Sequence, residues 1–113
     1  MIEKLYQIKI QLTITNEKKV NSKLNEVTQI PEDFISEAHK KIGLNVKRIR
    51  KAKKISQLEL SQRIGHKSVS IVSCAEINHK NHHFNIEHLL KIAYVLEVDV
   101  CEFFEGIECP KKA

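Results

Sequence analysis

The sequence of 113 residues is poor in glycine, proline and cysteine, and it lacks any long apolar run. No stretch approaches the roughly 20 apolar residues that a membrane-spanning helix requires, and the opening residues MIEK do not resemble a signal peptide. The cysteines, Cys74, Cys101 and Cys109, are odd in number and form no C-x-x-C pair, which is typical of a reducing compartment. We therefore expect a cytoplasmic protein that does not enter a membrane.

Motifs of enzyme chemistry are also missing. The sequence has no glycine-rich phosphate loop, no nucleophile motif and no carboxylate pair in an evident pocket. Histidines are more frequent: His79, His82 and His83 share one segment, with Cys74 before it and His88 after it. Because these spacings match no standard zinc or nickel pattern, we expect a polar loop there. We predict no enzyme, no cofactor and no metal.

The positive charge is unevenly placed. The formal net charge is +5, and one segment, KRIRKAKK, carries six basic residues that no acid interrupts: Lys47, Arg48, Arg50, Lys51, Lys53 and Lys54. Such a run is either a solvated helix face or a surface that binds a polyanion.

Apolar spacing predicts an all-α domain of five helices over residues 31–105, joined by short turns. The first begins near Pro31, which fits a first-turn position, and reaches about Lys53 with Gly43 as a point where it could loosen. Ser56 caps the second, with Glu59 as its capping-box partner.

The remaining helix ends follow similar signals. Gly65 ends the second helix, because glycine tolerates a left-handed conformation. Asn85 caps the helix IEHLLKIAYVLE, and Asp99 caps a last short helix with Glu102 as box partner. We expect both aromatic residues of that last helix to close the core: Phe103 and Phe104.

The first thirty residues form an extension whose structure the pattern leaves open. In QIKIQLTIT, apolar and polar residues alternate as in a strand, but Leu5, Ile8 and Leu12 also fit a helix face. A lone strand would need a partner, which would make residues 5–15 a dimerisation arm. Residues 106–113 are expected to be a flexible tail.

The segment SQLELSQRIGHKSVSIVSCAE holds two short helices around a glycine-containing turn, which describes a helix-turn-helix. With IGLNVKRIRKAKKI before it and IEHLLKIAYVLEVDVCEFFE after it, residues 41–105 resemble the lambda-repressor-like (Cro-type) DNA-binding domain. The resemblance implies a compact helical bundle whose second helix of the pair, about residues 68–76, is the recognition helix.

The register of that helix departs from the family spacing. Counting from Gly65 buries Ile71 and Cys74, whereas counting back from Glu76 buries Val72 and Ala75. The second count makes Ser68 the N-cap, where the first requires Lys67, a poor cap. We therefore predict the second register, with one extra residue in the turn.

The resemblance also implies residue roles. Facing the bases of a major groove would be Lys67, Ser68, Val69, Ser70 and Ser73. Contacts to phosphates would come from Gln57, Arg48, Lys51 and Lys80. Arg50 and Glu76 match a pair that ties the first helix to the recognition helix.

These assignments point to a transcriptional regulator, of repressor type from a bacterium or phage, that binds double-stranded DNA as a homodimer. The exposed serines have a plainer interpretation as solvated polar residues, and Arg, Asn and Gln, the bidentate readers of bases, are missing from this face. The alternative is a protein-interaction module, such as an antitoxin, that binds a partner protein through its N-terminal extension.

Overall fold

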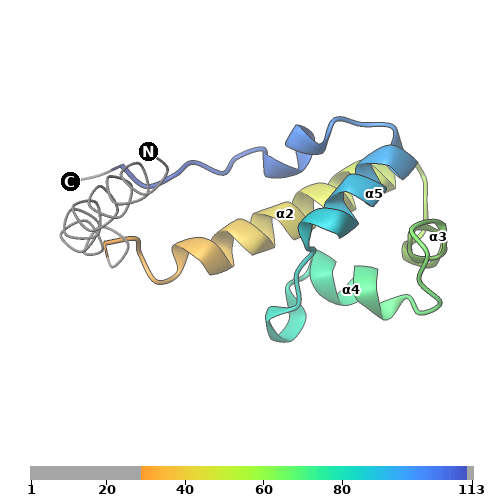
Figure 1. Cartoon of the computed structure of the whole chain (residues 1–113), viewed down its shortest axis with the longest axis horizontal. Coiled ribbons are helices and arrows are strands. Elements are labelled where there is room, and N and C mark those ends of the chain that lie inside the picture. Colours follow the sequence, from red (N-terminus) through yellow and green to blue (C-terminus); the bar gives the residue numbers. More distant parts are fainter. Residues whose placement is uncertain (1–28, 112–113) are drawn as a thin grey trace, which may run out of the picture. The chain divides into compact units, whose positions relative to one another are not determined.

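The computed structural model describes residues 29–111, and all regular secondary structure in this range is helical (Figure 1). Four α-helices and two short 3-10 helices follow one another: α2 (Phe34–Ala52), α3 (Gln57–Arg63), α4 (Ser70–Glu76), η1 (His79–Asn81), α5 (Ile86–Leu96) and η2 (Val100–Phe104). The all-α prediction is confirmed for these residues, but the fifth predicted helix is a 3-10 turn. The strand-or-helix question and the dimerisation arm lie outside the described residues. Within residues 29–111, no helix is both long and apolar enough to cross a bilayer.

Helix α2 begins at Phe34, a turn later than predicted, and runs without a break past Gly43. The expectation that Gly43 loosens this helix is therefore wrong. Glycine at this position instead lets α2 and α4 pack closely, because a Cβ atom there would lie 2.5 Å from the carbonyl oxygen of Ala75 in α4. The helix ends where Lys54 adopts φ +58°, and the Ile55 amide donates to the Arg50 carbonyl oxygen at 3.2 Å.

The caps of α3 and α5 lie where the sequence predicts them. The Ser56 hydroxyl accepts from the Glu59 amide at 3.0 Å, although the Glu59 side chain provides no return bond within the described part of the chain. Gly65 ends α3 with φ +96°. At α5, the Asn85 side chain accepts from the His88 amide at 2.7 Å, and the His88 Nδ1 accepts from the Asn85 amide at 3.2 Å. This reciprocal box, with histidine in the place of a carboxylate, was not predicted.

The last helix differs most from its prediction. The Asp99 carboxylate accepts from the Cys101 amide at 2.9 Å, in place of the predicted box with Glu102. Phe103 is fully buried, whereas Phe104 is 43% exposed and does not close the core. The reason is the 3-10 geometry: at three residues per turn, neighbouring side chains point about 120° apart and cannot both face inward.

One core holds these elements together in residues 32–109, which form a single compact unit. Helix α4 packs against α2 and α3, while η2 packs against α2 and α5. The core side chains come from every α-helix, from η2 and from the segments between helices: Ile42, Val46, Ile49, Leu60, Ile64, Val72, Ala75, Phe84, Leu89, Ile92, Ala93, Leu96 and Phe103. Ile107 also packs against this core, so the unit continues past residue 105.

Candidate nucleic-acid interface

Helix α4 has one buried side and one open side. Val72 and Ala75 are almost fully buried, which confirms the register counted back from Glu76. On the opposite side, Ser70 is exposed, Val69 is 37% exposed and Ser73 is half-buried. We call Val69, Ser70 and Ser73 the open face of α4. It carries no acidic group, since Glu76, the one carboxylate of this helix, lies on the buried side.

The turn before α4 starts the helix differently from the prediction. Val69, already in a helical conformation, takes the N-cap position, so α4 begins at Ser70 and not directly after Ser68. The Ser68 hydroxyl instead accepts from the Ser70 amide at 3.2 Å and shares a hydrogen bond with the Ser70 hydroxyl at 2.8 Å. The Ser73 hydroxyl donates to the Ser70 carbonyl oxygen at 3.4 Å. Because each hydroxyl offers one proton and two lone pairs, all three keep capacity for an outside partner.

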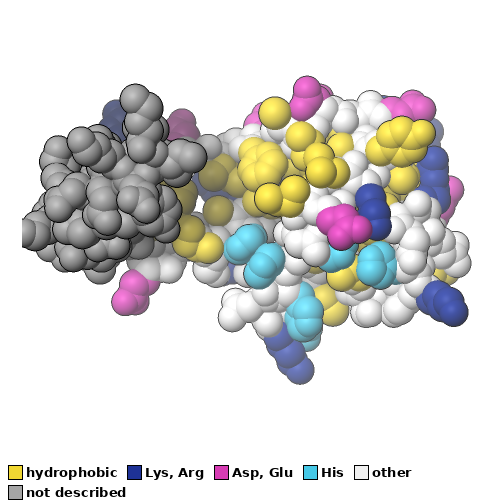
Figure 2. Space-filling model, in the orientation of Figure 1, with side chains coloured by type: hydrophobic (Ala, Val, Ile, Leu, Met, Phe, Trp, Pro, Cys, Tyr) yellow, Lys and Arg dark blue, Asp and Glu magenta, His cyan; other side chains and the backbone are white. Residues whose placement is uncertain are grey.

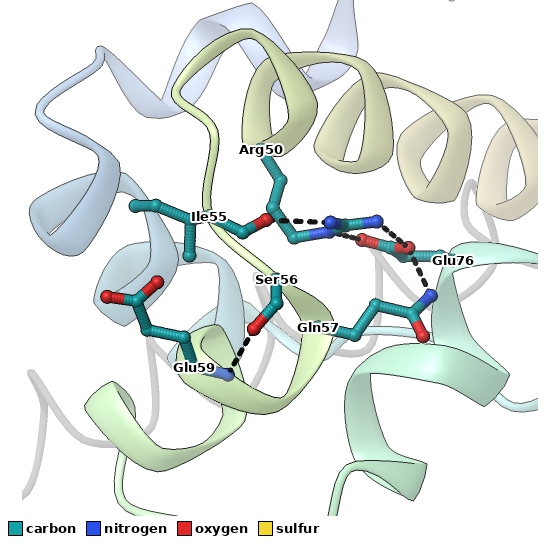
Figure 3. Close-up of polar contacts among 6 residues, drawn as sticks. All are labelled: Arg50, Ile55, Ser56, Gln57, Glu59 and Glu76. Carbon is teal, nitrogen blue, oxygen red and sulfur yellow. Dashed lines mark hydrogen bonds and ion pairs between the residues drawn. The ribbon is translucent and has the colours of Figure 1, made fainter.

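A buried ion pair fixes α4 to the end of α2 (Figure 3). Arg50 donates from Nε to one Glu76 oxygen at 2.7 Å and from Nη2 to the other at 3.0 Å. Arg50 is 6% exposed and Glu76 is fully buried. The third donor, Nη1, reaches the Ile55 carbonyl oxygen at 2.8 Å in the turn before α3. One guanidinium therefore joins α2, the turn and α4 in a fixed, bidentate geometry.

Gln57 completes this network, which sequence reasoning missed. Its Nε2 atom donates to a Glu76 oxygen at 2.8 Å, so the side chain predicted to contact phosphate lies against the ion pair (Figure 3). An amide nitrogen carries two protons, and the bond to Glu76 uses one of them. The contact between Gln57 and phosphate stays a prediction. The hydrogen bond from Gln57 to Glu76 links α3 directly to α4.

The basic run does not form one patch. Successive residues of an α-helix point about 100° apart, so Arg50 faces α4 while its neighbours face elsewhere. Arg48 lies 2.9 Å from Glu105, on the side of α2 that contacts the C-terminal segment. Of the remaining predicted phosphate contacts, Lys51 is exposed in the last turn of α2 and Lys80 is exposed after α4. Lys67 is exposed in the turn before α4.

Four of the six histidines form two pairs of rings. The rings of His39 and His83 stack with their centroids 3.8 Å apart, which joins α2 to the loop after α4. The rings of His66 and His88 meet edge to face at 5.5 Å. Within residues 29–111, no three His, Cys, Asp or Glu side chains are grouped so as to hold a metal ion. Nδ1 of His82 donates to the His79 carbonyl oxygen at 2.7 Å, so this histidine stabilises the local conformation of the loop.

Burial and neighbouring charge lower the pKa of two histidines. For His39 the main cause is desolvation and the second is His83. For His88 it is again desolvation, then His66, and Lys91 lowers the pKa further while Glu87 opposes the shift. The hydrogen bonding of His88 is consistent with its lowered pKa, because protonating its Nδ1 would break the bond that it accepts from the Asn85 amide.

We expect the protein to lose stability as the pH falls from 7.5 to 5.5. The ordinary pKa of histidine is 6.5, and the folded values of His39 and His88 lie below it. Below pH 6.5 the unfolded chain therefore binds more protons than the folded protein does. The stabilisation that the two neutral histidines provide is present above pH 6.5 and is lost as the pH falls through the pKa values of the folded protein. Urea denaturation at a series of pH values measures the effect.

Two substitutions provide the control for this profile. His39→Phe keeps a ring against His83, and His88→Gln keeps an acceptor for the Asn85 amide, but neither side chain titrates. The doubly substituted protein should show a flatter profile between pH 5.5 and 7.5. An unchanged slope would assign the pH dependence to other groups.

No protein-family model matches this chain, and no match is found among curated proteins. The function must therefore be inferred from the chemistry of the site itself.

Proposed function

We propose that this protein is a DNA-binding transcriptional regulator with a lambda-repressor-like fold, which inserts α4 into the major groove of double-stranded DNA. The observation that carries the proposal is the contrast between the two sides of α4. Buried residues and the Arg50–Glu76 pair fix one side, while the other presents small, uncharged side chains outward. A major groove admits one helix of this kind, and the absence of carboxylates removes repulsion from phosphates.

Recognition would combine weak readers of bases with phosphate contacts. The serine hydroxyls suit donors or acceptors on base edges, and the Val69 side chain suits the methyl group of thymine. Lys67 and Lys80 lie in the turns that precede and follow α4, with Lys51 and Gln57 as further candidates for phosphate. Arg48 is the least favourable of the predicted contacts, because Glu105 already neutralises it. Specificity would then rest partly on DNA shape.

The test is binding of the full chain to mixed duplex DNA, followed as fluorescence anisotropy at two salt concentrations. We expect binding that weakens steeply with salt, since neutralised phosphates release counterions. Selection of bound sequences from a random pool would then give the operator, with half-sites about one helical turn apart if a dimer binds. Absence of binding at low salt would favour the alternative of a protein-interaction module.

A substitution test locates the surface. Ser70→Glu combined with Ser73→Glu should lower the affinity for a selected site by at least about a hundredfold, because like charges facing each other across an interface cost several kcal/mol. Ile35→Glu combined with Leu44→Glu makes the same change of charge at exposed positions of α2 and should have a small effect. Equal losses in both variants would mean that net charge, and not the open face of α4, governs binding.

A further inference from the structure

Helix α5 carries a row of exposed apolar side chains that the proposed DNA contact does not use. Ile86 is 74% exposed, Leu90 54% and Tyr94 86%, and they follow one another at intervals of four residues along one side of the helix. We call these three residues the α5 stripe. The other side of α5 supplies four side chains to the core: Leu89, Ile92, Ala93 and Leu96. Figure 2 shows hydrophobic side chains lying open on the face of the molecule that α5 occupies in Figure 1.

The surroundings of the stripe are hollowed and carry few charges. A shallow hollow of about 470 Å³ lies beside it, bordered by Arg63 and Gly65 from the end of α3 and by Leu90 and Tyr94 from α5. Glu87 and Lys91 flank the stripe and form an ion pair of 2.9 Å. This pair cancels the charge of Lys91, so Arg63 leaves the surface around the stripe with only a small positive charge, which is too little to select a polyanion.

From this surface we infer that the protein associates with a second copy of itself, α5 stripe against α5 stripe. The flanking charges select this partner. A two-fold axis at Leu90 that sets the helices antiparallel brings Ile86 of one copy to Tyr94 of the other, and it places Glu87 within reach of the other copy's Lys91. Both copies then make the same two ion pairs, which is the self-complementarity that a symmetric dimer requires.

The size of the stripe sets the strength of the dimer. An 11-residue helix is about 16 Å long, and stable interfaces bury about 800 Å² per partner, which is more than three side chains provide. The dimer therefore has micromolar or weaker affinity unless a bound operator holds two copies together. The inference needs no DNA and stands or falls separately from the proposed function.

Analytical ultracentrifugation of the full chain without DNA, from micromolar to millimolar concentration, should show a monomer–dimer equilibrium. Leu90→Glu and Tyr94→Arg should each raise the dissociation constant at least about tenfold, because each places a charge among the apolar side chains of the contact, at the two-fold axis for Leu90 and opposite Ile86 for Tyr94. Leu44→Glu puts the same charge on an exposed leucine of α2 and should leave the equilibrium unchanged. Circular dichroism should show the same helix content for all variants.

A charge exchange tests the pairing itself. Glu87→Lys alone and Lys91→Glu alone should each weaken self-association, because each places like charges opposite one another. An equimolar mixture of the two variants should form a heterodimer, visible by native mass spectrometry, since every facing pair is then opposite in sign. A monomer at all concentrations overturns the inference. So does a dimer that survives Leu90→Glu and Tyr94→Arg, which would locate the contact elsewhere in the chain.

Discussion

Replacing Glu76 by alanine should lower the free energy of unfolding by about 3–5 kcal/mol, the cost of removing one partner of a buried ion pair. The remaining partner, Arg50, is 6% exposed and cannot lose its proton, so its charge would stay buried without a counterion. Gln57 would lose its acceptor in the same step. Urea or guanidinium denaturation measures the change. Because α4 would lose its anchor to α2, the proposed binding to DNA should weaken together with stability.

The matched controls separate the buried pair from an ordinary surface pair. Glu105→Ala breaks the exposed bridge to Arg48 and should cost no more than about 1 kcal/mol. Arg50→Met combined with Glu76→Leu removes both charges and should recover much of the loss, because no unpaired charge stays in the interior. A Glu76→Ala protein within about 1 kcal/mol of the parent would show that water reaches Arg50, contrary to its burial.

Local chemistry explains why much of the fold could be predicted. Ser56, Gly65 and Asn85 act at helix ends through their own side chain or backbone freedom, so their signals are visible in a few residues of sequence. The burial of Val72 and Ala75 followed from counting back from Glu76, although Ser68, the cap that favoured this register, is not the N-cap of α4.

The missed features either have no local signal in the sequence or depend on partners distant in the sequence. Lys54 and Glu97 end helices in the left-handed conformation that favours glycine, and no local signal marks them. Arg48 and Arg50 look alike within one basic run, yet one pairs with Glu105 and the other with Glu76. Which lysines and arginines are free to meet phosphate therefore depends on the fold. The same is true of Gln57, whose partner lies 19 residues away.

Gly43→Ala should destabilise the protein by about 1–2 kcal/mol, although alanine is the better helix former. In a helix interior the exchange alone would stabilise by about 1 kcal/mol. Here the new Cβ atom would lie 2.5 Å from the Ala75 carbonyl oxygen, 2.6 Å from the Glu76 carbonyl oxygen and 2.9 Å from the Glu76 carbonyl carbon. These are backbone atoms and cannot rotate away, so α4 must shift from α2 at the cost of overpacking. Chemical denaturation gives the sign of the change directly.

The neighbouring residue provides the control, and the sign of the effect decides the interpretation. Leu44 is 58% exposed in the same turn of α2, so Leu44→Ala should change stability by no more than about 0.5 kcal/mol. A shift of α4 would also carry Ser70 and Ser73 away from their positions relative to α3. Gly43→Ala should therefore weaken the proposed binding to DNA even under conditions in which the protein stays folded. A stabilised Gly43→Ala protein would mean that helix propensity acts alone and that α2 and α4 do not approach this closely. In that case the buried Arg50–Glu76 pair and the core packing of Val72 and Ala75 would restrain the orientation of the proposed recognition helix.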